Sequence, residues 1–240
     1  MKRLLPVLFL FALTTPVFSA PILQLYIEGG TYNAVTESWE SDGDSLTLWA
    51  IGDTKLGTIE DVHLAISYDS IYAPTISLTP STTDGYGGVT DLSTPVGTGT
   101  YIQTVDDGSS PLLGDGSSLA THGVYGDGTT WQEFDLGDFI LSDSPIGDYI
   151  TEFPDSFPSD GQVNVYDISI TGDNLGGMSL HFDLYDHVQA GNHISYKFAP
   201  FSHDADGTGG PPPIHMPEPS TMIMLGLGLA GVGVSRRRKR

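Results

Sequence analysis

Short segments of alternating apolar and polar residues run along most of the chain and predict β-strands. In the clearest of them, from Val62 to Tyr68, every second residue is large and apolar. Nine segments of this kind are rich in β-branched and aromatic residues and are separated by Gly, Asp, Asn, Ser or Pro. They are residues 22–27, 46–51, 62–68, 75–78, 101–105, 134–141, 163–170, 180–188 and 194–198. We therefore expect an all-β fold, an antiparallel β-sandwich that is immunoglobulin-like or jelly-roll-like.

The alternation also predicts that one face of these strands meets water. Phe182 and Leu184 point to one side of their strand, because side chains two residues apart share a face. His181, Asp183 and His187 then lie on the other side. We expect the apolar side to face the core and the polar side to face solvent.

Glycine and aspartate crowd residues 80–130, and glycine and proline crowd residues 207–216. Both residue types suit turns, so the first stretch predicts long loops that leave the sandwich. The sequence leaves open whether these loops are plain turns or a binding region. The second stretch is typical of a flexible linker, which would bound a single domain at residues 20–206.

The first nineteen residues have the pattern of a secretory signal peptide. Lys2 and Arg3 precede an apolar stretch at residues 4–13, and small residues follow it. If cleavage follows Ser19, then Ser19 and Val17 are the first and third residues before the cleaved bond, the two positions that signal peptidase binds in small pockets. We therefore expect the Sec translocon and signal peptidase as partners in export.

A second targeting signal lies at residues 217–240. Pro217, Glu218 and Pro219 precede an uncharged apolar run of thirteen residues, 222–234. As a helix this run would span roughly 20 Å, against a hydrocarbon core of about 30 Å, so it predicts a short, marginal transmembrane helix. A cluster of basic residues, which we call the basic stop, follows this run and favours the cytoplasmic side of the membrane for the chain's last residues. The basic residues are Arg236, Arg237, Arg238, Lys239 and Arg240.

The Pro-Glu-Pro triplet, the apolar run and the basic cluster together resemble the PEP-CTERM sorting signal of Gram-negative bacteria. The resemblance implies recognition by an exosortase, cleavage near the triplet, and delivery to the cell surface or its exopolysaccharide matrix. Contact with the membrane would then be transient and limited to the C-terminal helix before processing. The alternative is an ordinary anchor that is never cleaved, which would favour a longer apolar span.

The charge of residues 20–216, which we call the body of the protein, excludes some classes of partner. Of nine Lys and Arg residues only Lys55 and Lys197 lie within residues 20–216, and of thirty acids only Glu218 lies outside them. This region therefore has 29 acids, 2 bases and a formal charge of −27. Such a surface repels nucleic acid phosphates, which excludes DNA or RNA binding, and it attracts cations. The chain has no cysteine, so the fold does not depend on disulfides.

Two groups of residues are candidate metal ligands. Asp204 and Asp206, beside His203 and Gly207, offer hard oxygen atoms at alternate positions, which suits Ca²⁺. An EF-hand is not present, because Pro213 stands where its last ligand, a glutamate, belongs. A turn at the end of the last strand is the alternative interpretation.

The second group is His181, Asp183 and His187, to which His193 can be added. Alternate spacing places the first three on one strand face, and imidazole with carboxylate suits Zn²⁺ or a similar transition metal. Polar residues on an exposed face are the alternative, and they need no metal.

Signals for catalysis are weaker. Glycosidases use two carboxylates about 5–9 Å apart, and pairs such as Glu133 with Asp135, or Glu152 with Asp155, are candidates. With 29 acids in the body such pairs are unspecific, and no nucleophile-elbow, zincin or phosphate-loop motif is present. We therefore assign no catalytic residue.

The body also resembles the choice-of-anchor N group of bacterial surface proteins. The residues that carry this resemblance are 23–29, 46–49, 180–186 and 198–205. It implies a surface ectodomain without an assigned reaction. We therefore favour a noncatalytic surface or matrix protein that could bind exopolysaccharide, with Trp39, Trp49, Trp131 or the many tyrosines as candidate stacking residues. For any single tryptophan, a place in the core is the favoured interpretation. The alternatives are a secreted polysaccharide-active enzyme and a calcium-stabilised adhesin.

Overall fold

The computed structural model describes residues 22–42, 45–81, 99–114, 116–121, 123–148, 150, 158–187 and 204–208. This part of the chain forms twelve β-strands and one 3₁₀ turn, and it contains no α-helix. None of its elements is a helix with the length and apolarity needed to span a membrane. The predicted signal peptide, the strand at residues 194–198, the linker and the sorting signal lie outside the described residues.

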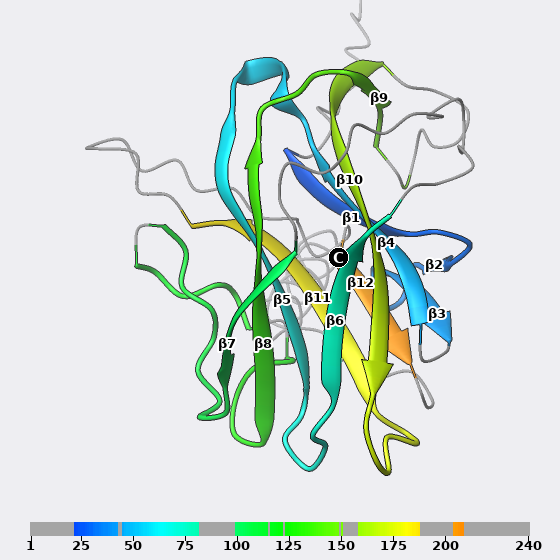
Figure 1. Ribbon diagram of the computed structural model, residues 1–240, viewed down its shortest axis with the longest axis vertical. Helices are drawn as coiled ribbons and strands as arrows, with labels where there is room; N and C mark the ends of the chain where they lie inside the picture. Colours follow the sequence, from blue (N-terminus) through cyan, green and yellow to red (C-terminus); the bar gives the residue numbers. More distant parts are fainter. Residues whose placement is uncertain are drawn as a thin grey trace, which may run out of the picture.

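One sheet is antiparallel throughout and has its longest strand near the middle (Figure 1). Its order is β1–β4–β10–β6, and β9 pairs with the start of β10. The strands are β1 (Leu23–Ile27), β4 (Ser45–Gly52), β6 (Thr75–Pro80), β9 (Ser144–Ile146) and β10 (Ser159–Thr171). The 3₁₀ turn (Thr54–Leu56) follows β4, and Asp53 caps it by accepting a hydrogen bond from the Lys55 backbone.

The other sheet has the order β2–β3–β12–β11–β5–β8–β7. Its strands are β2 (Thr31–Asn33), β3 (Ser38–Asp42), β5 (Ile59–Asp69), β7 (Thr100–Val105), β8 (Thr129–Phe139), β11 (Ser179–Asp186) and β12 (Asp204–Thr208). β12 lies inside this sheet, antiparallel to β11 and parallel to β3. The other pairings of this sheet are antiparallel.

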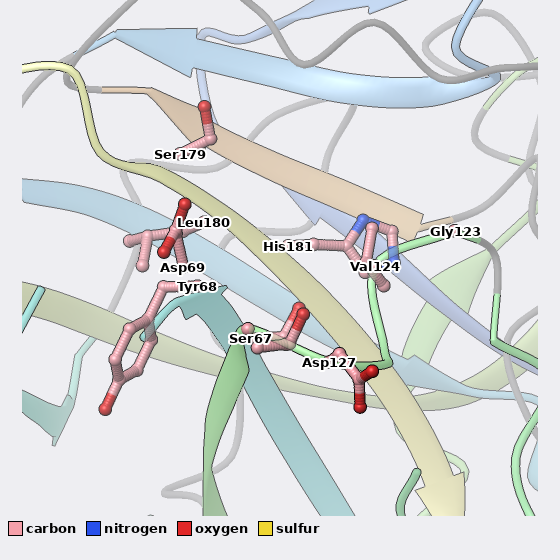
Figure 2. Close-up of a pocket in the computed structure, with 11 residues that line it drawn as sticks. Ser67, Tyr68, Asp69, Gly123, Val124, Asp127, Ser179, Leu180 and His181 are labelled. Carbon is pink, nitrogen blue, oxygen red and sulfur yellow. The ribbon is translucent and has the colours of Figure 1, made fainter. Parts of the chain in front are cut away.

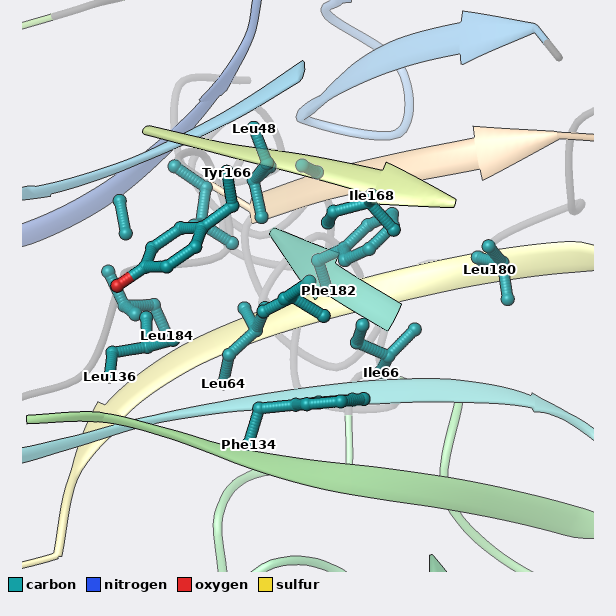
Figure 3. Close-up of a cluster of buried hydrophobic side chains, with 14 of the residues drawn as sticks. Leu48, Leu64, Ile66, Phe134, Leu136, Tyr166, Ile168, Leu180, Phe182 and Leu184 are labelled. Atoms are coloured by element: carbon teal, nitrogen blue, oxygen red, sulfur yellow. The ribbon is translucent and has the colours of Figure 1, made fainter. Parts of the chain in front are cut away.

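The main hydrophobic core lies between the two sheets (Figure 3). Phe134 and Ile66 from β8 and β5 face Leu48 and Ile168 from β4 and β10, while Phe182 of β11 lies among them. All five side chains are buried. Apolar residues at alternate positions of strands in both sheets supply this core, so the predicted all-β sandwich is confirmed.

The outer face of the larger sheet is not the exposed surface that the alternation predicts. Ala65 of β5 and Tyr185 of β11 pack there under Leu113, Leu119 and Tyr125, which belong to the chain between β7 and β8. Part of the Gly/Asp-rich stretch thus covers the sheet, and the polar residues of β5, β8 and β11 are enclosed beneath it. The alternation identified the two faces correctly, but it carries no information about what covers the second one.

Candidate functional site

The pairing of β11 with β12 brings together residues from both predicted metal groups. His181 lies opposite Asp206, and Phe182 lies opposite Ala205. Asp183 and Asp204 occupy the next positions along the two strands, on the same outer face as His181 and Asp206. We call these four residues the buried cluster, because each of their side chains is almost completely enclosed.

His181 is the centre of the buried cluster. Its Nδ1 lies 2.7 Å from Asp206 Oδ1, and its Nε2 lies 3.5 Å from Asp183 Oδ1 and 3.8 Å from Asp204 Oδ2. Residues outside the cluster orient the carboxylates, since the Ser38 hydroxyl donates to Asp206 and the Tyr125 hydroxyl donates to Asp183. One atom each of His181, Asp183 and Asp204 lies within 4.8 Å of the others, a spacing that a metal ion could bridge.

Three carboxyl groups and one imidazole share this enclosed space, so each shifts the pKa of the others. Burial lowers the pKa of His181, but the charges of Asp183 and Asp206 outweigh it and raise the pKa well above its usual value. Burial and the charge of Asp183 raise the pKa of Asp204 well above its usual value. In the described part of the chain Lys55 is the only lysine or arginine, and His181 is the basic side chain that is seen to contact these carboxylates.

A cavity of about 400 Å³ lies beside the buried cluster (Figure 2). His181 lines it, together with Ser67 of β5 and with Val124 and Asp127 of the chain between β7 and β8, which covers the sheet. The rest of its wall is formed by Tyr68, Asp69, Gly123, Gly128, Thr129, Ser179 and Leu180. A small ligand or ion therefore has space on the side of the cluster where His181 lies.

His187 does not join the buried cluster, although the strand alternation grouped it with His181 and Asp183. It follows the end of β11 and lies near Asp61 and His63 of β5. The rings of His63 and His187 are stacked, with centroids 4.9 Å apart and an interplanar angle of 11°. We call Asp61, His63 and His187 the histidine pair site.

Two features of the backbone hold the histidine pair site in place. β5 and β8 change register twice near Asp61, and Asp61 adopts a left-handed φ of 53°, which is rare for a non-glycine residue. The Asp138 carboxylate accepts from the Asp61 backbone NH at 2.8 Å, and the Asp61 carbonyl accepts from the His187 backbone NH at 2.9 Å. The bulge therefore presents Asp61 to both histidines.

Glu133 lies behind His63 and is satisfied by three donors. Its Oε1 is 2.8 Å from His63 Nδ1 and accepts from the Tyr185 hydroxyl at 2.7 Å, while its Oε2 accepts from Gln103 Nε2 at 2.6 Å. Burial raises the pKa of Glu133, but the hydrogen bonds from these three residues outweigh it and lower the pKa to about 2.

The low pKa bears on the predicted acid pair of Glu133 and Asp135. The general acid of a glycosidase holds its proton because its pKa is raised, so Glu133 does not fit that role. Asp135 accepts from the Gly137 backbone NH at 2.7 Å and thereby supports the local backbone. The second pair, Glu152 and Asp155, lies outside the described residues, as do His193 and His203.

The tryptophans that were candidates for sugar stacking are mostly enclosed. Trp49 is fully buried and donates through Nε1 to Glu28, and Trp131 is 3% exposed and donates to the Ser109 carbonyl. Trp39 is half-buried against Tyr26 and Tyr32. Trp49 and Trp131 therefore serve packing, and only Trp39 keeps part of its ring at the surface.

Comparison with known proteins identifies the C-terminal segment. The model of the PEP-CTERM protein-sorting motif matches residues 217–239, which include Pro217, Glu218, Pro219 and most of the basic stop. No curated protein and no solved structure matches the chain. The match covers only the C-terminal segment, and it implies export to the cell envelope or surface. The chain thus carries a PEP-CTERM protein-sorting motif and is an exosortase-sorted, exported protein.

Proposed function

We propose that the protein is a noncatalytic module of the cell surface or extracellular matrix, held there after exosortase processing and binding matrix polysaccharide. The observation that carries this proposal is the sorting motif at residues 217–239. The chemistry of the body supports it, because Glu133, an acid of one candidate catalytic pair, is held ionised by three donors. A surface module needs a stable scaffold, and the core between the two sheets, together with the covered outer face of the larger sheet, supplies one.

Removing the sorting triplet should stop processing. In a producing strain, the combined Pro217→Ala, Glu218→Ala and Pro219→Ala variant should stay at its precursor length in the membrane fraction, whereas the unaltered chain reaches the surface or matrix. Immunoblots of the separated fractions measure both quantities. Ser220→Ala is the matched control, since it changes the neighbouring residue and leaves the triplet intact. Normal processing of the triple variant would contradict the proposed route.

The polysaccharide part of the proposal depends on surface aromatic rings. In the described residues Tyr101 of the edge strand β7 is 52% exposed, beside the exposed Ile102. The excess of acids favours a neutral polysaccharide, or an acidic one bridged by cations, over a bare polyanion. Tyr101 is therefore the ring that we assign to sugar stacking.

Tyr101→Ala should weaken co-sedimentation with the producer's own exopolysaccharide by about 2- to 12-fold, because an aromatic contact contributes about 0.5–1.5 kcal/mol. Tyr101→Phe keeps the ring and should bind like the unaltered chain. Incubation with the same polysaccharide should release no new reducing ends. Equal binding by the alanine variant would remove Tyr101 from the proposal, and new reducing ends would favour the enzyme alternative.

The same proposal includes a structural cation at the buried cluster. His181 supplies a nitrogen, while Asp183 and Asp204 supply oxygens, and one such atom of each residue lies within 4.8 Å of the others. Ca²⁺ takes six to eight oxygen ligands, so this mixed set fits a first-row divalent ion better. Such an ion would link β11 to β12, two strands joined by 17 intervening residues.

A further inference from the structure

The three side chains of the histidine pair site come from two neighbouring strands of the larger sheet, or from just beyond their ends. Asp61 and His63 come from the bulged part of β5, and His187 follows β11. One ligand atom of each lies within 4.8 Å of the other two. His63 is buried, whereas the side chains of Asp61 and His187 are 43% and 45% exposed. The site therefore opens to solvent on one side.

Two distances at the site are close to the spacing between ligands of a tetrahedral metal centre. His63 Nε2 lies 3.1 Å from Asp61 Oδ1, and His187 Nδ1 lies 3.5 Å from Asp61 Oδ2. Two ligands bound to zinc at about 2.0–2.1 Å in tetrahedral geometry lie about 3.3 Å apart. To bind one ion, the exposed His187 ring would have to turn out of its stack on His63 so that its ring plane meets the ion, and one Asp61 oxygen would have to face both histidines.

The groups behind His63 have the arrangement found at metal-binding histidines. A ligating imidazole usually donates its second ring NH to a carboxylate, which fixes the tautomer and the ring orientation. Here Glu133 lies 2.8 Å from His63 Nδ1, so a proton on Nδ1 leaves the lone pair of Nε2 directed at Asp61. Glu133 is itself held by Tyr185 and Gln103.

We propose that Asp61, His63 and His187 bind a divalent zinc-type ion, with the fourth position open to solvent. Two imidazoles and one carboxylate suit zinc, cobalt or nickel, whereas calcium and magnesium favour oxygen alone. The left-handed backbone of Asp61 supports this assignment, because strained residues concentrate at functional sites. The open position can accept water or an oxygen of an external ligand at the protein surface.

The competing arrangement has no metal. In it a protonated His63 bridges Glu133 and Asp61, and His187 only stacks on the ring. The two arrangements differ in the role of His187, which is a ligand in the first and dispensable in the second. His187 is exposed and lies beyond the end of β11, so replacing it should leave the fold intact.

The test is zinc binding by the full chain, purified in mild detergent and stripped of metal with a chelator. Titration against a chromophoric chelator gives the affinity, and Co²⁺ in place of Zn²⁺ gives a visible absorption band that reports tetrahedral coordination. His187→Gln and Asp61→Asn should each weaken binding by about tenfold or more. Asn tolerates the left-handed backbone, so the second variant changes the ligand and leaves the local conformation intact.

Asp160→Asn is the matched control, because it removes an exposed acid from β10 in the other sheet and should bind zinc normally. Asp204→Asn removes a candidate ligand from the buried cluster and should leave the affinity of the histidine pair site unchanged. The proposal is overturned if the unaltered chain binds no zinc. It is also overturned if His187→Gln and Asp61→Asn bind as tightly as the unaltered chain, which would assign any bound ion to the buried cluster and leave the histidine pair site in the arrangement without metal.

Discussion

Replacing Glu133 with alanine should lower the free energy of unfolding by about 3–5 kcal/mol, the usual cost of breaking a buried charged pair from one side. Glu133 is 4% exposed, and its carboxylate accepts from Tyr185 and Gln103 and contacts His63. The variant leaves the buried Tyr185 hydroxyl and the His63 ring without that partner, so the loss exceeds that of one hydrogen bond. Urea unfolding at neutral pH measures it.

Glu60→Ala is the control for this prediction. Glu60 also lies in the larger sheet, but its side chain is exposed, and a surface substitution changes stability by about 0.5 kcal/mol or less. A loss below about 1 kcal/mol for Glu133→Ala would contradict this prediction. It would show that water reaches Tyr185 and His63 and replaces the carboxylate as their hydrogen-bond partner.

Phe182→Ala should destabilise the protein by a similar amount, about 3–5 kcal/mol, through loss of burial and the cavity left behind. Phe182 is fully buried between the sheets, and its ring packs against Gly207 of β12, where an added Cβ would lie 3.3 Å from the ring. Figure 3 shows the ring among Leu64, Ile66 and Ile168. The cavity therefore opens where β11, β12 and the opposite sheet meet.

For a domain of this size the change corresponds to a fall in melting temperature of about 6–20 °C, measurable by calorimetry. Ile71→Ala is the control, because Ile71 is 77% exposed in the turn after β5 and should change the melting temperature little. A fall of less than about 3 °C for Phe182→Ala would mean that the surrounding residues close the cavity.

Most of the larger strands were predictable from the sequence. Eight of the nine predicted segments overlap strands, because alternation of large apolar residues survives wherever one face meets the core. The boundaries are less accurate, since the segment predicted at residues 134–141 corresponds to β8 at Thr129–Phe139. β2, β3, β9 and β12 were not predicted. They are three to five residues long and contain few large apolar residues, so no period is detectable.

The grouping of the site residues could be predicted only in part. Alternation placed His181 and Asp183 on one face, and the structure confirms that they are neighbours. Their contact with Asp204 and Asp206 depends on β12, which the turn interpretation of residues 203–207 did not include. His187 was assigned to the wrong group, because the strand ends at Asp186 and the period of two no longer applies beyond it.

Asp61 and His63 were not predicted as candidate ligands. The signal was available, because an acid and a histidine two residues apart also occur at His181 and Asp183. What the sequence does not contain is the bulge that directs Asp61 towards His187, or the register that places Glu133 beside His63. Both are set by pairing between strands far apart in the chain.

The position of β12 has a mechanical consequence for a protein that is sorted through its C-terminal segment. Eight residues separate Thr208 from Pro217, so they can extend over at most about 30 Å. Any pull on that segment passes directly into β12. Because β12 pairs with β3 on one side and β11 on the other, force along the strand must shear two rows of hydrogen bonds together. A terminal strand at the sheet edge would be held by only one such row, so this placement favours resistance to tension at the cell surface.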